Sequence, residues 1–214
     1  MSKEFNLKCL APLIEEALYY PTISSTPPGR DTSVSFGMTL FGLVISLKAK
    51  NVVELGVRGG GSAYPLLLGT YLTGGKLTSV DIAPCNTSWA DDIDIPNITD
   101  HWTVETCDAR YFLETYDELI DLVFIDDWHE YNHVLSELEA VKDKIAPNGI
   151  ITMHDAMYSN WEPKYHEDLD ATGEFGGGGV YKAIKDFTNK YPGEWEYCTI
   201  PVDHGLTILR KLIT

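Results

Sequence analysis

One pattern limits the fold of this 214-residue chain more than any other: short apolar runs, each followed by a glycine or an acidic residue and then by helical periodicity. The runs show little polar alternation, which is typical of strands buried on both faces. Strands that alternate with helices in this way predict a parallel sheet covered by helices on each side. The predicted strands are 51–55, 76–80, 102–105, 122–125 and 150–153, and the helices between them are about 61–72, 109–116 and 131–144.

Two extended runs near the carboxyl end of the chain follow a different pattern. Residues 194–202 and 206–211 are joined by Asp203-His204-Gly205, a short polar connection that contains a glycine. This arrangement is typical of a β-hairpin, which would add an antiparallel edge to the parallel sheet. The sequence therefore predicts an α/β fold with a doubly wound, mostly parallel sheet of seven strands that ends in an antiparallel hairpin.

Helical segments precede the first strand. Residues 11–20 and 33–48 carry apolar residues at helical spacing, with a Pro-Pro-Gly sequence between them that cannot continue a helix. The length of the chain suits one domain. We therefore expect a single domain over residues 1–214, with a helical extension at 1–48 and a core at 49–214. The apolar residues of the extension would also suit a homodimer.

The segment 157–179 interrupts the alternation of strands and helices. It is rich in aromatic and acidic residues and ends in four consecutive glycines. Long loops in compact domains are most often functional or disordered, and this one follows the fifth predicted strand at the carboxyl end of the sheet, where open α/β folds bind ligands. We expect it to be a lid over the site, with its glycines as a hinge.

The chain is strongly acidic, with 16 basic residues, 32 acidic residues and a formal net charge of −16. Such a protein repels phosphate groups, which argues against nucleic acid and anionic membranes as partners. No apolar run approaches the roughly 20 residues that span a bilayer, and the first residues lack the build of a signal peptide. Four scattered cysteines indicate reduced thiols, and together these features predict a cytoplasmic protein.

The first segment with chemical meaning is Val52-Val53-Glu54-Leu55-Gly56-Val57-Arg58-Gly59-Gly60-Gly61-Ser62, where a predicted strand enters a glycine-rich turn and a helix begins. Glycines permit a tight turn and let a ligand approach the backbone closely. Their spacing matches neither the dinucleotide fingerprint nor a Walker motif, which disfavours a nicotinamide oxidoreductase. A carboxylate at Glu54, two residues before the first glycine, would repel a pyrophosphate and suit a cationic ligand.

Two more acids stand at the ends of predicted strands. Asp81 closes the second strand, and in nucleoside-binding α/β folds such an acid accepts hydrogen bonds from the two ribose hydroxyls; a solvated strand end is the alternative. Asp108 follows the third strand. Two roles are open for it, accepting a hydrogen bond from an exocyclic adenine amine or capping the helix that follows.

In this order the motifs resemble those of the class I S-adenosylmethionine-dependent methyltransferases, from about residue 52 to the C-terminal hairpin. That family has a seven-stranded sheet whose last strand is antiparallel. The resemblance implies that the glycine-rich turn contacts the methionine part of the cofactor, that Asp81 holds the ribose and that Asp108 lies near the adenine. It implies as cofactor-binding residues Glu54, Gly56, Gly59, Gly61, Ser62, Asp81, Asp108, Ala109 and Asp126.

Two predicted strands each lead into a carboxylate, Asp126 and Asp155. Because neighbouring parallel strands end at one edge of a sheet, the two acids are expected to converge on a divalent metal such as Mg²⁺ or Ca²⁺, which prefer oxygen ligands. Ile125-Asp126-x-Trp128 is similar to a stretch of the metal-assisted small-molecule O-methyltransferases, including the catechol type. In that group the metal binds the hydroxyls of the acceptor and lowers their pKa.

The sequence departs from the catechol-type pattern at two positions, which leaves metal binding open. Ala156 follows Asp155 where that pattern has an asparagine, and His129 stands where it has a lysine base. Asp126-x-x-His129-x-Tyr131 with His154-Asp155 resembles the sugar and antibiotic O-methyltransferases more closely. Two roles are open for His129, a base for a hydroxyl proton or a histidine that orders the loop. His154 is expected to support Asp155 by a hydrogen bond.

A competing motif overlaps this region. His129-Glu130-Tyr131-Asn132-His133 fits H-E-x-x-H, the zinc metalloprotease pattern. That pattern needs both histidines on one face of a helix, whereas His129 lies three residues after a predicted buried strand. The glycine-rich turn would also have no role, so a zinc hydrolase is a weak alternative. A non-catalytic cofactor-binding protein of the same fold is a second alternative.

The sequence thus predicts a cytoplasmic O-methyltransferase that uses S-adenosylmethionine. His129 and Asp126 are the predicted catalytic residues, and Asp126 and Asp155 are the predicted metal ligands. The expected acceptor is a small neutral molecule with a hydroxyl group, such as a polyol, a sugar or a phenol.

Overall fold

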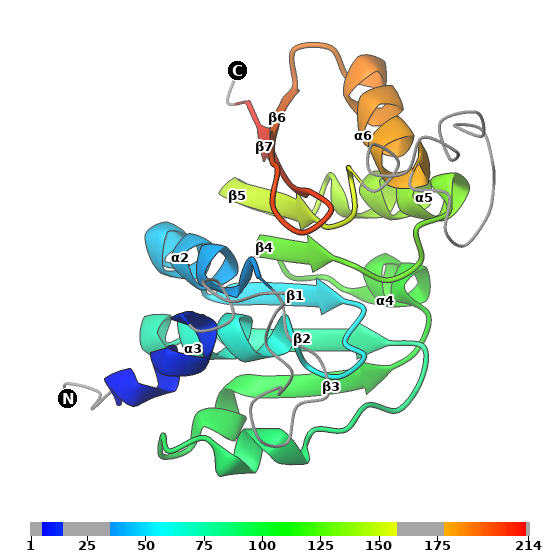
Figure 1. Cartoon of the computed structure of the whole chain (residues 1–214). Helices are drawn as coiled ribbons and strands as arrows, with labels where there is room; N and C mark the ends of the chain where they lie inside the picture. The colour runs from blue at the N-terminus through cyan, green and yellow to red at the C-terminus, as the bar shows by residue number, and fades with distance from the viewer. Residues whose placement is uncertain (1–5, 15–34, 158–177, 213–214) are drawn as a thin grey trace.

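The computed structural model describes residues 6–14, 35–157 and 178–212. Its centre is a seven-stranded sheet in the order β3-β2-β1-β4-β5-β7-β6 (Figure 1). The first five strands are parallel, and β7 is antiparallel to β5 and β6, so the predicted sheet and hairpin are confirmed. The strands are β1 (Asn51–Leu55), β2 (Lys76–Asp81), β3 (Trp102–Thr106), β4 (Ile120–Ile125), β5 (Ile145–Met153), β6 (Trp195–Ile200) and β7 (Leu206–Lys211).

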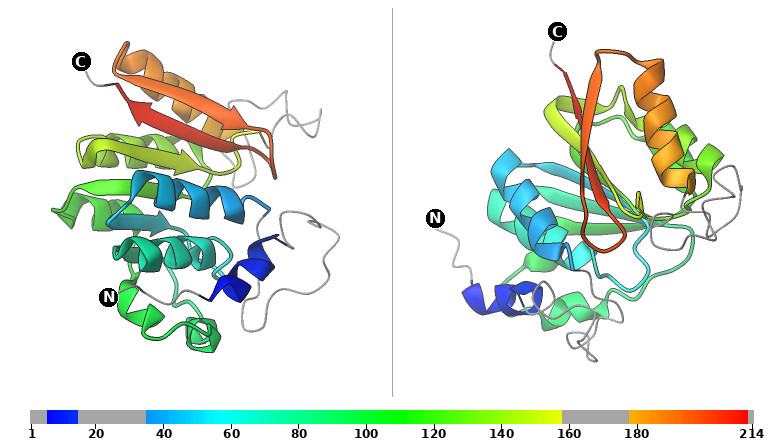
Figure 2. Two further views of the ribbon diagram at one scale, coloured as in Figure 1. Left: turned by 90° about the vertical axis from the view of Figure 1, so that its left-hand side faces the viewer. Right: turned by 45° about the horizontal axis from the view of Figure 1, so that its top comes forward.

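Helices cover both faces of the sheet (Figure 2). Within the described residues, none of them combines the length and apolarity that crossing a bilayer requires. One face carries α2 (Gly37–Leu47) and α3 (Ala63–Thr73), and the other carries α4 (Ala109–Thr115), α5 (Tyr131–Val141) and α6 (Gly178–Lys190). Three short 3₁₀ helices are η1 (Leu7–Leu10), η2 (Ser88–Asp92) and η3 (Ile98–His101).

The central strand β1 shows why the predicted strands lack polar alternation. Val52 belongs to the apolar cluster beneath α2 and α3, whereas Val53 and Leu55 belong to the cluster beneath α4, α5 and α6. All three side chains are fully buried. A strand that contributes to two cores has no solvent-facing side, so both sets of alternating side chains are apolar. Glu54, which shares the face of Val52, is the exception.

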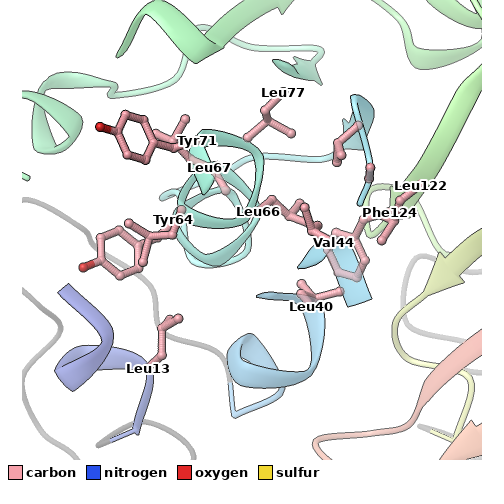
Figure 3. Packing of buried hydrophobic residues seen from close by; sticks show 14 of the residues in the cluster. Leu13, Leu40, Val44, Tyr64, Leu66, Leu67, Tyr71, Leu77, Leu122 and Phe124 are labelled. Carbon is pink, nitrogen blue, oxygen red and sulfur yellow. The ribbon is translucent and has the colours of Figure 1, made fainter. Parts of the chain in front are cut away.

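The core beneath α2 and α3 is closely packed (Figure 3). Leu40 and Val44 of α2 point toward the sheet, where Phe124 of β4 completes the contact layer. At Gly69 of α3 an added Cβ would lie 2.8 Å from the Cβ of Val44, so the two helices approach to the limit that a glycine allows. The apolar residues of α2 therefore serve the core of this chain, and the homodimer stays a prediction.

Several element boundaries differ from those expected. β4 begins at Ile120 and β5 at Ile145, because these residues form a first parallel pair before the register shifts between Ile120 and Leu122. Pro147, Asn148 and Gly149 are typical of a turn, so the sequence did not predict that the strands extend to this pair. α6, which begins at Gly178, was not predicted as a helix; most of the expected lid, 158–177, lies outside the described residues, as does 15–34 of the helical extension.

The order of the strands in the sheet indicates where a ligand would bind. β1 lies between β2 and β4, and the chain runs outward from β1 in both directions, so a crevice is expected where β1 and β4 end. Two backbone hydrogen bonds continue the pairing beyond the strands. Asp126 donates its N–H to the carbonyl of Leu55, and His154 donates to that of Ile125. The residues that follow β1, β4 and β5 therefore lie side by side at one edge.

Replacing Leu40 by alanine should lower the free energy of unfolding by about 2–5 kcal/mol, because a fully buried leucine leaves a cavity between α2 and the sheet. Urea denaturation of the purified protein measures the loss. Ile45→Ala on the same helix is the matched control, since this side chain is only partly buried and should cost clearly less. Equal losses in the two variants would contradict the packing described here.

Candidate functional site

A cavity of about 600 Å³ opens at the carboxyl edge of the sheet, on the side of α4 and α5. Four residues predicted to bind a cofactor line it: Gly56, Asp81, Asp108 and Ala109. Its apolar surface comes in part from two exposed side chains, Ile82 and Trp128, which are 74% and 48% accessible. The remaining lining residues are Val80, Cys107, Arg110, Asp127, Glu130, Asn132 and His133.

The carboxylate of Asp81 fixes the glycine-rich turn. One of its oxygens accepts hydrogen bonds from the N–H groups of Val57 (2.9 Å) and Arg58 (3.0 Å), and the other accepts from Ala83 (2.9 Å). Burial raises the pKa of Asp81, but the hydrogen bonds from Arg58, Ala83 and Val57 outweigh it, so the pKa lies below its ordinary value. Asp81 is therefore ionised at neutral pH, and its remaining lone pairs can accept from hydroxyl groups.

Gly56 begins the turn in a conformation that favours glycine, with φ +90°. An added Cβ would lie 2.3 Å from the carbonyl oxygen of Asp126. The turn after β1 is therefore pressed against the first residue after β4, which leaves no room for a side chain there. This contact also joins the wall of the cavity to the acidic residues described below.

Glu54 is placed differently from the sequence expectation. Its side chain is fully buried and points to the face of α3, where it accepts hydrogen bonds of 2.5 Å from the hydroxyls of Ser62 and Ser79. Among the described residues it does not line the cavity. Burial raises its pKa to about 7, against the effect of the two serine hydroxyls. In this structure Glu54 holds Ser62 at the start of α3, and a direct contact with a ligand stays a prediction.

The other turn residues that were predicted to bind the cofactor are buried rather than exposed to the cavity. Gly59, Gly61 and Ser62 are buried and do not border it within the described part of the chain. Asp108 takes the capping role, because it accepts from the N–H groups of Arg110 (2.9 Å) and Tyr111 (3.3 Å) at the start of α4. It also lines the cavity, and its contact with an adenine amine stays a prediction. The hydrogen bond from the Arg110 guanidinium, followed by those from the two backbone N–H groups, holds the pKa of Asp108 below its ordinary value.

Beyond the turn, two acids and two histidines gather where β4 and β5 end; we call Asp126, His129, His154 and Asp155 the β4–β5 cluster. The Nε2 atom of His129 lies 3.4 Å from Asp126 Oδ1 and 3.1 Å from Asp155 Oδ2. The Nδ1 atom of His154 lies 3.3 Å from Asp126 Oδ1 and 3.4 Å from Asp155 Oδ1. The predicted convergence of the two carboxylates is therefore present in the structure.

His154 is fixed from both sides. Its Nε2 atom is hydrogen-bonded to the backbone carbonyl of Asp203 in the β6–β7 connection, and its ring lies against Phe36 with 4.5 Å between centroids. Because a carbonyl only accepts, Nε2 carries a hydrogen, and Nδ1 faces the two carboxylates. Burial lowers the pKa of His154, but the hydrogen bond and charge of Asp126 and the charge of Asp155 dominate and raise it to about 9.

His129 lies in the connection between β4 and α5. Burial lowers its pKa, but Asp126 and Asp155 outweigh burial, so the pKa of His129 lies above its ordinary value. The backbone of His129 is also in contact with α6, because a Cβ at Gly179 would lie 2.1 Å from the His129 carbonyl oxygen. The end of the expected lid segment is thus anchored against the residue predicted to act as a base.

The β4–β5 cluster has donors that fit a divalent cation. Ligand atoms of Asp126, His154 and Asp155 all lie within 4.8 Å of one another. Asp155 Oδ1 is buried, and among the described residues it has no hydrogen bond, only the Nδ1 atoms of His154 and His204 at 3.4 Å and 3.5 Å, so it has lone pairs available for an ion. His154 supplies the third donor that the sequence seemed to lack at Ala156. The nitrogen donor favours first-row transition ions beside the predicted Mg²⁺.

The H-E-x-x-H motif does not form a zinc site, so the zinc hydrolase alternative is wrong in its geometry. His129 faces Asp126 and Asp155, whereas His133 lies 3.0 Å from Asp127 Oδ2. Glu130 is the N-cap of α5 and accepts from the N–H of His133. The physical reason is that α5 begins only after Glu130, so the two histidines do not share a helical face.

The sequence analysis did not predict that two residues of this region, His154 and Glu137, belong to clusters of ionisable side chains. His154 follows an apolar strand directly, and its position one residue before Asp155 was the only signal for its place in the cluster. Glu137 is fully buried in α5 near His133, and its spacing of four residues from His133 was the signal. The cluster of His154 depends on contacts between distant strands, whereas Glu137 meets its neighbours Asp127 and His133 locally.

Comparisons with known proteins agree with this geometry. A family model described as a methyltransferase domain matches residues 53–156, the segment that holds every residue of the cavity and of the β4–β5 cluster. The comparison with curated proteins gave no match. The predicted resemblance to class I methyltransferases is confirmed.

Solved structures share the fold across nearly the whole chain. The methyltransferase PaMTH1 of Podospora anserina, bound to SAH, has a TM-score of 0.67 at 16% identity and covers 98% of this chain and 89% of its own. An O-methyltransferase of Bacillus cereus in complex with SAH has a TM-score of 0.65 at 17% identity, with 96% and 91% covered. The O-methyltransferase TomG of Streptomyces achromogenes, in complex with SAM, has a TM-score of 0.66 at 15% identity, with 98% and 91% covered.

The buried carboxyl of Glu54 should make the protein less stable as pH rises. Its pKa is 4.5 in the unfolded chain and about 7 in the folded one, so the folded state holds the proton over this interval. The stabilisation of the folded state by the protonated Glu54 carboxyl is fully present below about pH 4.5 and is lost as the pH rises through about 7. The loss in the free energy of unfolding is on the order of 3 kcal/mol at most.

Urea denaturation at about pH 5 and about pH 8 tests this, with Glu54→Gln as the variant that cannot ionise. The stability difference between Glu54→Gln and the wild type should shift in favour of the variant at the higher pH. Glu118→Gln, an exposed change, is the control. A wild type that keeps the same difference from Glu54→Gln at both pH values would contradict the burial argument.

Proposed function

Since residues 53–156 match a family model described as a methyltransferase domain, we propose that the chain transfers a methyl group from S-adenosylmethionine to a hydroxyl of a small molecule. The observation that carries this proposal is the adjacency of two sites at one sheet edge. A cavity lined by Asp81, Asp108 and apolar side chains suits a nucleoside, and the β4–β5 cluster beside it suits a hydroxyl group. The neighbours solved with SAM or SAH support the choice of cofactor.

The cavity suits the nucleoside half of that cofactor. Asp81, ionised and at the end of β2, is placed to accept from the two ribose hydroxyls. Ile82 and Trp128 offer exposed apolar surface for an adenine ring, and Asp108 offers a carboxylate oxygen for its exocyclic amine. The acidic edge of the sheet complements a cofactor that carries a positive sulfonium.

When bound, S-adenosylmethionine supplies an electrophilic methyl group, which leaves its sulfur as the acceptor oxygen forms the new bond. The protein therefore has to align a hydroxyl and remove its proton. Asp126 and Asp155 provide carboxylate oxygens that can accept from an acceptor hydroxyl, and His129 Nε2 lies within 3.4 Å of both. His129 is the base in this proposal, because its raised pKa makes the neutral ring a stronger proton acceptor.

A divalent cation held by Asp126, His154 and Asp155 is part of the proposal. Such an ion would lower the pKa of a coordinated acceptor hydroxyl. The hydrogen bond from His154 to the Asp203 carbonyl orients that ring as partners of ligating histidines do. O-methylation of a polyol, sugar or phenol, metal assistance and a cytoplasmic location are thus proposed together.

Replacing Asp81 by alanine should weaken the binding of S-adenosylmethionine by at least about tenfold, because the ribose hydroxyls lose a charged acceptor. Isothermal titration calorimetry with S-adenosylmethionine or S-adenosylhomocysteine measures the affinity. Asp91→Ala, an exposed acid in η2, should bind as the wild type does. Unchanged affinity in a folded Asp81→Ala protein would refute the cofactor placement.

Replacing His129 by glutamine should lower kcat by roughly 10²–10⁴-fold while leaving cofactor affinity intact, because the base is lost and the cavity is not altered. The assay measures S-adenosylhomocysteine released with hydroxylated acceptors from a panel of phenols and sugars. In the wild type kcat should rise with pH through a pKa above 6.5, and this limb should vanish in the variant. A variant that retains the wild-type kcat and pH profile would exclude the base role.

A further inference from the structure

A second group of ionisable side chains has no chemical role in the methyl transfer proposed above; we call Asp127, His133 and Glu137 the α5 cluster. Ligand atoms of these three residues lie within 4.8 Å of one another. His133 Nε2 is 3.0 Å from Asp127 Oδ2 and 3.3 Å from Glu137 Oε1. The proposed methyl transfer gives these contacts no role.

Glu137 is the residue that needs explanation. Its side chain has no exposed surface, and neither of its carboxylate oxygens has a hydrogen-bond partner in the described part of the chain. The Oδ1 atom of Asp127 is also buried and unbonded. A carboxylate without solvent or hydrogen bonds costs several kcal/mol unless it takes up a proton or a cation lies beside it. Arg110, whose charge acts on Glu137, forms its ion pair with Asp108.

A proton on His133 satisfies only part of this group. The imidazole has one hydrogen at Nε2, and the Asp127 oxygen at 3.0 Å is its hydrogen-bond partner. Glu137 then faces the same nitrogen without a donor of its own. With a neutral imidazole the three side chains carry two negative charges, which a divalent ion balances.

The distances suit a tetrahedral ion. Donors at about 2.1 Å from a Zn²⁺ ion lie about 3.4 Å from one another in a tetrahedron. His133 Nε2 is 3.0 Å and 3.3 Å from its two carboxylate neighbours, close to that spacing. The local structure also holds the donors in place, since His133 and Glu137 share one face of α5 at a spacing of four residues and Glu130 caps the helix just before them.

We propose that the α5 cluster is a binding site for a divalent transition ion of the Zn²⁺ class, separate from the β4–β5 cluster. One imidazole and two carboxylates are donors that such ions accept, whereas Mg²⁺ prefers oxygen ligands alone. Three protein donors leave a fourth position for water. Asp127 and His133 border the cavity, whereas Glu137 is fully buried in α5. A bound ion would therefore link the wall of the cavity to α5.

The experiment uses Co²⁺ as a coloured substitute for Zn²⁺ and weakens the β4–β5 cluster first. Asp155→Asn removes the negative charge of one of its donors and so weakens that site, and asparagine tolerates the left-handed backbone of that position, with φ 60°. Equilibrium dialysis and the visible absorption of Co²⁺ are measured for Asp155→Asn. The protein should bind one Co²⁺ with the strong absorption typical of tetrahedral coordination.

Adding Glu137→Gln to Asp155→Asn should weaken that binding by at least about tenfold. The matched control adds Glu139→Gln instead, the same change two positions along α5, at a residue paired with Lys190 and Tyr191. Far-UV circular dichroism checks that each variant folds. Asp127→Asn replaces Glu137→Gln if the latter does not fold, and the expected loss is the same.

Two results would overturn the proposal: no Co²⁺ binding by Asp155→Asn, or equal Co²⁺ affinity in the Glu137→Gln and Glu139→Gln variants. The first result together with Co²⁺ binding by the wild type would leave the β4–β5 cluster as the metal site. The proposed methyl transfer is tested separately, by calorimetry with S-adenosylmethionine, so a failure of either proposal is distinguishable from a failure of the other.

Discussion

The parallel pairing of β4 with β1 on one side and β5 on the other is the constraint on which the rest of the structure depends. Parallel neighbours end at the same edge, and two backbone hydrogen bonds, from Asp126 to Leu55 and from His154 to Ile125, continue the pairing past the strands. Residues 29 positions apart in sequence, Asp126 and Asp155, are thereby brought to the same pair of imidazoles. Without this alignment neither the cavity nor the cluster would form.

The edge is crowded with acids, and the protein stabilises them without lysines. Asp81 accepts three backbone N–H groups, Asp126 and Asp155 face two histidines, and Glu54 accepts two serine hydroxyls. Directional donors of this kind hold a carboxylate in one place, which a flexible lysine does less well. Asp81 in particular stays ionised at this edge, and this suits the cationic cofactor proposed for it.

The sequence predicted the positions of candidate site residues correctly where the position follows from the end of a strand. Asp81, Asp108, Asp126 and Asp155 each lie at or just after the end of a strand, and all four lie at the expected edge. The prediction was less successful where a role depends on the direction of a side chain. Glu54 lies on β1, but the two-residue period of the strand turns it toward α3 and away from the cavity.

The sequence by itself determined the class of fold, because buried strands and amphipathic helices impose different periods on the apolar residues. It also determined which acids reach the ligand-binding edge, since that requires only the end of each strand. The tertiary structure decided which side chains meet there. His154 joins Asp126 through a hairpin carbonyl at Asp203, and Glu137 loses all contact with solvent, because distant elements pack around them. Such contacts have no local pattern in the sequence.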